Sequence, residues 1–180
     1  MRTSRRMLIA VTALLGACAA PAPDKPAVGP GPQLGRVASA DEVRTRSISV
    51  APDGRGLPAG RGSVAQGAGV YAKKCESCHG AQGTGKPADA LVGGIGTLAT
   101  EAPVRTVGSY WPYATTLFDY VRRAMPTTAP MSLSNDEVYA VTAYVLNLNG
   151  IVPADAVLDA RTLAQVRMPN RDGFIDYSRR

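Results

Sequence analysis

The feature that most restricts the fold of this chain is the pentapeptide Cys75-Glu76-Ser77-Cys78-His79. Cys-x-x-Cys-His is the spacing at which haem c is bonded to protein. The two thiols can add to the two vinyl groups of one haem, and the adjacent imidazole then lies beneath the iron. The motif therefore predicts one covalent haem c attached through Cys75 and Cys78, with His79 as proximal ligand, and it indicates a carrier of electrons.

Other uses of a Cys-x-x-Cys pair fit the sequence less well. A structural zinc site needs four Cys or His ligands, but the only other cysteine is Cys18 and the only histidine is His79. A thioredoxin-like dithiol lies where a strand enters a helix, whereas Cys75 follows a helical stretch and precedes a glycine-rich loop. A redox dithiol, or a chance motif in a non-haem interaction lipoprotein, is the alternative reading.

The N-terminus predicts export from the cytoplasm. Three arginines precede an apolar run over residues 7–17. That run is shorter than the roughly 20 residues needed to cross a bilayer, and it has the length of a signal-peptide core. Residues 1–17 are therefore interpreted as a lipoprotein signal peptide.

Cys18 is the predicted lipidation site, because Leu15-Gly16-Ala17-Cys18 resembles a bacterial lipobox. Ordinary cleavage near residues 17–19 is the alternative. Since Ala19 follows the cysteine, where an Asp would favour the inner membrane, we expect a periplasmic protein anchored by lipid, at the outer rather than the inner membrane.

The charge balance gives no sign of a nucleic-acid partner. The formal net charge is +6, and removal of the signal arginines leaves 17 basic and 14 acidic residues, or +3. No basic stripe with interleaved aromatic residues is present.

The remaining chain divides by composition into four parts. Residues 18–36 form a tether rich in Pro, Ala and Gly. Residues 37–62 are expected to form an irregular wrap across the haem domain, with a helical turn at 41–46, an extended piece at 48–50 and consecutive turns at 52–58. The haem domain spans 63–150, and a C-terminal extension over 151–180 is expected to pack on it.

Three helices are predicted inside the haem domain. Capping boxes at Ser63 with Gln66 and at Ser134 with Glu137 begin helices over about 64–75 and 134–149. A middle helix covers 113–124. An apolar stripe marks the last helix, which ends at Gly150; its residues are Val138, Val141, Val145 and Leu148. The fold class is thus all-α, with a core so small that the haem forms a large part of it.

The second axial ligand is expected to be a methionine. Methionine opposite histidine raises the reduction potential, and a second histidine does not exist. Met125 is favoured because Pro126 fixes the turn that presents its sulfur. Met131 and Met168 are the alternatives, and an open coordination site, with enzyme or gas-sensing chemistry, is the remaining one.

Several residues are expected to support the haem. The carbonyl of Pro87, or of a residue near it, is a candidate acceptor for the His79 ring. Trp111 or a neighbouring tyrosine is a candidate partner of a haem propionate, with core filling as the alternative. Five cations are candidates for a docking rim: Lys73, Lys74, Lys86, Arg122 and Arg123.

The chain resembles class I c-type cytochromes, and within them two narrower groups. The segment from Val107 to Pro126 is similar to the haem subunits of periplasmic molybdenum sulfite dehydrogenases and to a haem domain of the Sox-type sulfane dehydrogenase cytochrome subunit. Further matches lie at residues 53–58, 149–153 and 168–174. Unlike some of these relatives, which carry two haems, this chain has one motif.

The resemblance implies a monohaem electron-transfer protein rather than an enzyme. By position, Cys75 and Cys78 bind the haem, His79 is the proximal ligand and Met125 the distal one. The implied electron donor is a molybdopterin sulfite or sulfane dehydrogenase, and the acceptor is a terminal oxidase or another cytochrome. A generic shuttle for another dehydrogenase is the alternative function.

Overall fold

A computed structural model describes residues 34–175 and 177 of the chain. The predicted signal peptide, the lipidation site Cys18 and most of the tether lie outside the described residues. Contacts divide the chain into two units, Met1–Ser39 and Ala40–Arg180, and the elements below all belong to the second. Among the described residues, no helix combines the length and the apolar character needed to cross a membrane.

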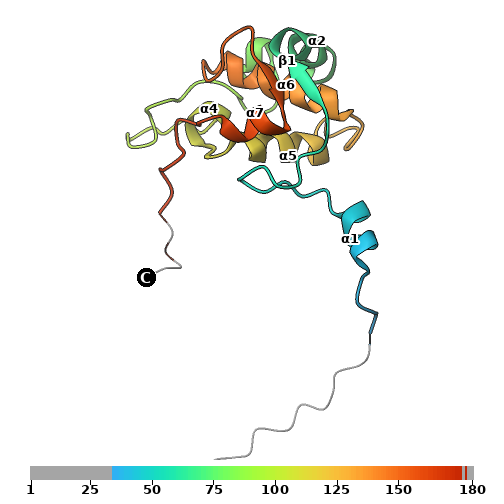
Figure 1. Ribbon diagram of the computed structural model, residues 1–180. Helices are drawn as coiled ribbons and strands as arrows, with labels where there is room; N and C mark the ends of the chain where they lie inside the picture. Colours follow the sequence, from blue (N-terminus) through green and yellow to red (C-terminus); the bar gives the residue numbers. More distant parts are fainter. Residues whose placement is uncertain (1–33, 176, 178–180) are drawn as a thin grey trace, which may run out of the picture. The chain divides into compact units, whose positions relative to one another are not determined.

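Two helices, α2 (Val64–Lys74) and α6 (Asn135–Leu148), pack closely against each other in the second unit (Figure 1). Both begin at the predicted capping boxes: Ser63 accepts from the Gln66 N–H, and Ser134 from the Glu137 N–H. A side chain at Gly67 would place its Cβ 1.9 Å from the carbonyl oxygen of Ala140. Only glycine therefore lets the two helices approach this closely.

Helix α6 is buried on more sides than its apolar stripe indicated. Val138, Val141 and Val145 are buried as predicted. Tyr139 and Leu146, off that stripe, are fully buried too, because helix α5 (Ala114–Ala124) and a small sheet also pack against α6. The sheet pairs β1 (Arg61–Ser63) with β2 (Val157–Asp159) in antiparallel register, with Gly62 opposite Leu158.

The all-α prediction is confirmed with one addition, since the sheet was not predicted. Strands of three residues are too short to show an alternating pattern. Four short helical elements precede α5 in the chain: α1 (Ala40–Arg46), α3 (Glu76–His79), the 3₁₀ turn η1 (Ala81–Gly83) and α4 (Val107–Tyr110).

The C-terminal residues contribute to the same core. Helix α7 (Ala160–Gln165) begins at Asp159, whose carboxylate accepts from the N–H groups of Arg161 and Thr162. Leu158, Leu163 and Met168 are buried in the cluster that contains Phe118 of α5.

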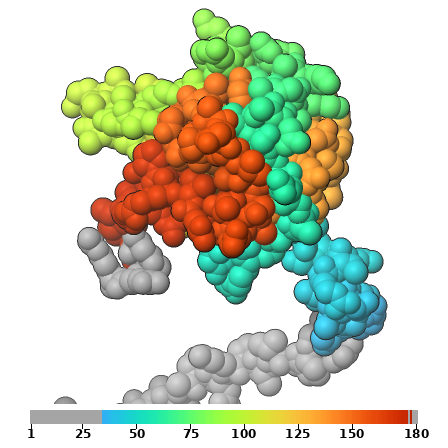
Figure 2. All heavy atoms as spheres, turned by 45° about the horizontal axis from the view of Figure 1, so that its top comes forward, coloured from blue at the N-terminus to red at the C-terminus, as the bar shows by residue number. Residues whose placement is uncertain are grey.

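A long loop joins η1 to α4. Part of it, in yellow-green, projects from the body of the unit (Figure 2). The base of the loop is fastened by the Thr106 hydroxyl, which donates to the Gly93 carbonyl at 2.6 Å, and by the Asn149 amide, which donates to the Leu91 carbonyl at 3.1 Å.

Candidate haem site

The Cys-x-x-Cys-His motif begins where α2 ends. Cys75 is both the C-cap of α2 and the N-cap of α3, which holds Cys78 and His79. Both thiols are free. Burial, with a smaller contribution from Cys78, raises the pKa of Cys75 to about 11. The thiol is therefore protonated at neutral pH before it is bonded to any group.

The imidazole of His79 is oriented by a backbone carbonyl. Its Nδ1 lies 2.8 Å from the carbonyl oxygen of Asp89. Because a carbonyl only accepts, the proton is on Nδ1, and Nε2 keeps a lone pair for a metal. The acceptor is thus two residues beyond Pro87, within the neighbourhood that the sequence indicated.

The loop that supplies Asp89 is itself held against the motif. The Gly85 N–H donates to the His79 carbonyl at 2.7 Å, and the Ala88 N–H donates to the Cys78 carbonyl at 2.8 Å. Gly85 has a φ of +93°, a conformation that glycine adopts without strain. The glycines after the motif therefore allow the loop to fold back around His79.

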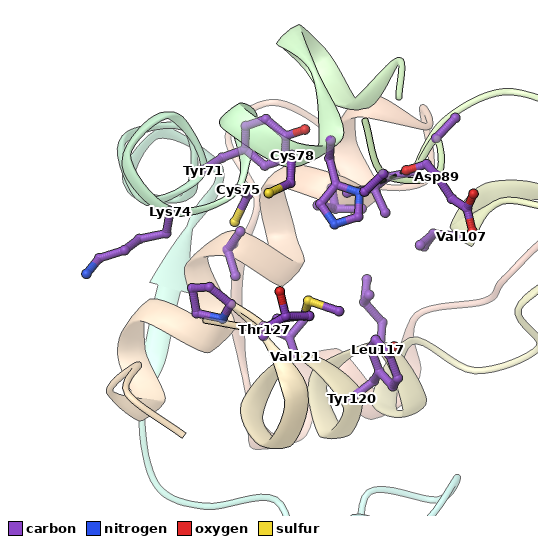
Figure 3. Close-up of a pocket in the computed structure, with 18 of the residues that line it drawn as sticks. Tyr71, Lys74, Cys75, Cys78, Asp89, Val107, Leu117, Tyr120, Val121 and Thr127 are labelled. Atoms are coloured by element: carbon purple, nitrogen blue, oxygen red, sulfur yellow. Dashed lines mark hydrogen bonds between the residues drawn. The ribbon is translucent and has the colours of Figure 1, made fainter. Parts of the chain in front are cut away.

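A cavity of about 470 Å³ opens beside this motif. In Figure 3, Cys75 and Cys78 lie on one side of it, and Leu117, Tyr120 and Val121 of α5 lie on the other. Many of its other lining side chains are apolar, among them Tyr71, Leu91, Val107, Trp111, Val141 and Val145. The cavity is thus a largely apolar slot with two thiols and an imidazole on one wall.

Met125 lies on the wall of the same cavity. It is the residue that ends α5, and its N–H donates to the Val121 carbonyl at 3.1 Å. The other two candidates are elsewhere. Met131 is 62% exposed, and Met168, 1% exposed, is buried in the hydrophobic core; neither lines the cavity. Among the described methionines, the structure brings only Met125 to the cavity that His79 lines.

Trp111 also lines the cavity, and its ring meets that of Tyr120 edge to face, with centroids 5.6 Å apart. Of the five cations predicted as a docking rim, Lys74 lines the cavity. Arg123 forms an ion pair with Asp119, and Arg122 donates to the Ile48 carbonyl. These two arginines therefore make contacts within the fold.

Sequence reasoning did not identify two charged residues at the cavity, Asp89 and Arg105. Arg105 lies over the ring of Tyr110, 5.6 Å from its centroid. Both residues come from the loop between η1 and α4, which has no periodic pattern. Their proximity to the motif follows only from the way that this loop returns to α4.

The residues fit haem c. Two thiols spaced for the vinyl groups, an imidazole with a free Nε2 and a thioether lie around one apolar cavity. Soft sulfur and imidazole are the ligands of low-spin haem iron. Cys75 and Cys78 would hold the group covalently, with His79 and Met125 as the donors from the chain.

Comparison with known proteins agrees with haem c as the cofactor. Residues 62–145 match the family described as cytochrome c oxidase, cbb3-type, subunit III. No curated protein matches the chain significantly. Among solved structures, the chain is similar to one in the crystal structure of the sulfane dehydrogenase SoxCD from Paracoccus pantotrophus. The two share 44% identity and a TM-score of 0.76, over 82% of this chain and 73% of that one.

The match extends well beyond the five-residue motif and includes most of both chains. The family match includes the haem-binding motif, and the solved structure shares the fold. The chain therefore belongs to the class I c-type cytochromes, carries haem c, and resembles the cytochrome subunit of sulfane dehydrogenase.

Proposed function

We propose that this cytochrome is a periplasmic single-haem carrier that accepts electrons from a molybdenum sulfite or sulfane dehydrogenase. It passes them to a terminal oxidase or to another cytochrome. The observation that carries the proposal is the 44% identity to a chain of a sulfane dehydrogenase, over 73% of that chain. The electron-transfer role itself follows from membership of the family.

In this proposal His79 and Met125 would hold the haem iron. When bound, haem c supplies one-electron exchange at its iron. The chain keeps the His79 proton on Nδ1 by the bond to the Asp89 carbonyl. It presents the Met125 sulfur at the end of α5, which favours a high reduction potential. Leu117, Val121 and Val141 form an apolar wall that would shield a bound haem from water.

Absorption spectroscopy tests the ligand assignment. The oxidised protein should show the weak far-red band of methionine-ligated ferric haem, and Met125→Ala should abolish it. Met131→Ala is the matched control, because that exposed side chain is outside the cavity. Loss of the band in Met131→Ala instead, or absence of the band from the unaltered protein, would refute the assignment; the second result would favour an open-site haem enzyme or sensor.

A reduction assay tests the electron donor. The cytochrome is purified from its own cells under mild conditions, and the copurifying protein is assayed for molybdopterin. Sulfite, or a sulfane-sulfur compound, is then added, and haem reduction is followed. We expect rapid reduction only when the molybdenum protein is present. If neither compound reduces the haem in the presence of the molybdenum protein, the proposed donor is wrong, and the alternative, a shuttle for a different dehydrogenase, is favoured.

We also propose that the mature protein begins at a lipidated Cys18, as the lipobox resemblance implies. Mass spectrometry of the mature N-terminus should find acyl chains on that cysteine, and cell fractionation should place the protein with the outer membrane. Cys18→Ser should release it into the soluble fraction. An unmodified N-terminus would favour the alternative cleavage and a soluble periplasmic protein.

A further inference from the structure

Besides its packing against α6, helix α5 has the haem cavity on one side and a segment of the N-terminal wrap on the opposite side. Leu117, Val121 and Met125 lie on the cavity side. On the opposite side the helix is bound by residues 48–52, which we call the strap. The strap belongs to the N-terminal wrap and lies more than sixty residues away from α5 in the sequence.

Three hydrogen bonds join the strap to α5. The Val50 N–H donates to Asp119 Oδ1 at 3.0 Å, and the Thr115 hydroxyl donates to the Pro52 carbonyl at 3.1 Å. The Arg122 guanidinium donates to the Ile48 carbonyl at 3.4 Å. These three residues of α5 are spaced four and then three apart, which places them on one face of the helix.

Asp119 is the best-held of the three. Its Oδ1 accepts from the strap, while its Oδ2 accepts from Arg123, with Nη2 at 2.5 Å. The Asp119 side chain is only 18% exposed, although its partner Arg123 is 41% exposed. A hydrogen bond to an ionised carboxylate is roughly twice as strong as one between neutral groups. The bond from Arg122 to the Ile48 carbonyl also has a charged partner, but it is longer, at 3.4 Å against 3.0 Å, so the bond from Val50 to Asp119 is the stronger of the two charged links.

The position of Met125 depends on the last turn of this helix. Met125 follows Ala124 directly, and its N–H is bonded to Val121 within that turn. A backbone movement that withdraws the sulfur from the cavity requires the end of α5 to shift or unwind. Bonds that fasten the opposite face of the helix oppose such a movement.

We propose that Asp119 is a positioning residue, and that it keeps the Met125 sulfur in the haem cavity by fastening α5 to the strap. The inference rests on the proposed assignment of Met125 as the distal ligand. A bound haem that lost the Met125 sulfur would have a lower reduction potential and would admit an added ligand. The strap thus extends the haem site to a segment that precedes the haem-binding motif.

Asp119→Ala in the full haem-containing protein tests the proposal. It removes the acceptor for Val50 and frees α5 from the strap. The far-red methionine band should weaken, and the reduction potential should fall. Imidazole added to the oxidised protein should bind about tenfold faster, since one charge-assisted hydrogen bond no longer opposes opening.

Two variants serve as controls. Arg123→Ala removes the ion pair but leaves the Val50 bond, so the band, the potential and the imidazole rate should stay near those of the unaltered protein. Asp119→Asn keeps an oxygen that can accept from Val50 and should restore most of the band. If Asp119→Ala does not fold, Thr115→Val removes the bond to Pro52 and should give a smaller change in the same direction.

The outcomes separate this inference from the proposed function. If the unaltered protein lacks the methionine band, the ligand assignment fails and the inference fails with it. In a second outcome, the band is present and Met125→Ala abolishes it, but Asp119→Ala leaves the band, the reduction potential and the rate of imidazole binding unchanged. The assignment of Met125 as a ligand is then retained, and only the positioning role of Asp119 is wrong. A purely structural role of Asp119 would lower the unfolding free energy without any change in these three properties.

Discussion

The hydroxyl of Tyr71 donates a hydrogen bond of 2.9 Å to the carbonyl oxygen of Gly80, the residue that follows His79. Tyr71 is only 2% exposed, and its ring meets that of Tyr144 on α6, with centroids 5.3 Å apart. Helix α2 is thereby bonded to the segment on the far side of the motif that it introduces. The Tyr71 side chain thus connects the contact between α2 and α6 to the side of the cavity that holds His79.

Tyr71→Phe should lower the free energy of unfolding by about 1 kcal/mol, the usual contribution of a buried neutral hydrogen bond. The loss is moderate because the Gly80 carbonyl still accepts from the Gly83 N–H at 3.1 Å. Denaturant unfolding of the haem-containing protein measures it. Tyr144→Phe removes a hydroxyl from the other ring of the pair and should cost less; equal losses would contradict a specific role of the Gly80 bond.

Two buried tyrosines should lower the free energy of unfolding at alkaline pH. Burial raises the pKa of both Tyr71 and Tyr139 from 10.0 to about 12. Below pH 10 both are neutral in the folded and unfolded chains, so no difference arises. Between about pH 10 and 12 the unfolded chain ionises first, and the unfolding free energy falls as pH rises.

Tyr139→Phe should make this alkaline decline shallower. The variant also loses the 2.8 Å bond from the Tyr139 hydroxyl to the Pro58 carbonyl, so its stability at neutral pH should be lower than that of the unaltered protein. Denaturant titrations followed by circular dichroism at several alkaline pH values give both quantities. An unchanged slope would show that Tyr139 does not contribute to the decline.

The proximal half of the site is the part that sequence predicts well, because it is local. Two helices follow from capping boxes and periodicity, and the haem attachment follows from five consecutive residues. For the carbonyl that accepts from the His79 ring, the sequence indicates only the neighbourhood of Pro87, because every residue has a backbone carbonyl and no residue type marks the one that is used. Its identity as Asp89 depends on how the loop turns.

The contacts that sequence reasoning missed join distant segments. Gly62 pairs with Leu158 across the small sheet, and the bond from Val50 to Asp119 joins the strap to α5. Neither strand of the sheet is long enough to show an alternating hydrophobic pattern. Nothing near Arg122 in the sequence indicates that its hydrogen-bond partner is the Ile48 carbonyl. Such pairings are set by the packed fold as a whole.

The two capping boxes should differ in their response to acid. Ser134→Ala and Ser63→Ala each remove a helix cap and should cost about 1 kcal/mol at neutral pH. In the Ser134 box, hydrogen bonds from Ser134 lower the pKa of Glu137 below its ordinary value of 4.5. In the second box the corresponding residue is the uncharged Gln66, whose Oε1 accepts from the Ser63 N–H at 2.9 Å.

The cost of Ser134→Ala should therefore shrink as pH falls. A carboxyl group whose pKa is lowered by folding stabilises the fold at pH values above its ordinary pKa. That stabilisation is lost as the pH falls through the lowered pKa of the folded state. The cost of Ser63→Ala should stay constant over the same range. Urea unfolding at neutral pH and at about pH 3 compares the two; parallel behaviour of both variants would refute the role of the Glu137 charge.

Two glycines on the same helix should respond in opposite ways to alanine. At Gly67 the new Cβ would lie 1.9 Å from the Ala140 carbonyl oxygen, so α2 and α6 must separate. We expect a loss of about 3 kcal/mol, at the upper end of the cost of overpacking a core. At Gly69 no atom lies within 4 Å of the added Cβ, and alanine should stabilise the helix by about 0.5–1 kcal/mol. Thermal unfolding of the haem-containing variants measures both changes. Because the two positions share one helix and one substitution, helix propensity alone predicts a gain at both, and only the contact with Ala140 predicts a loss at Gly67.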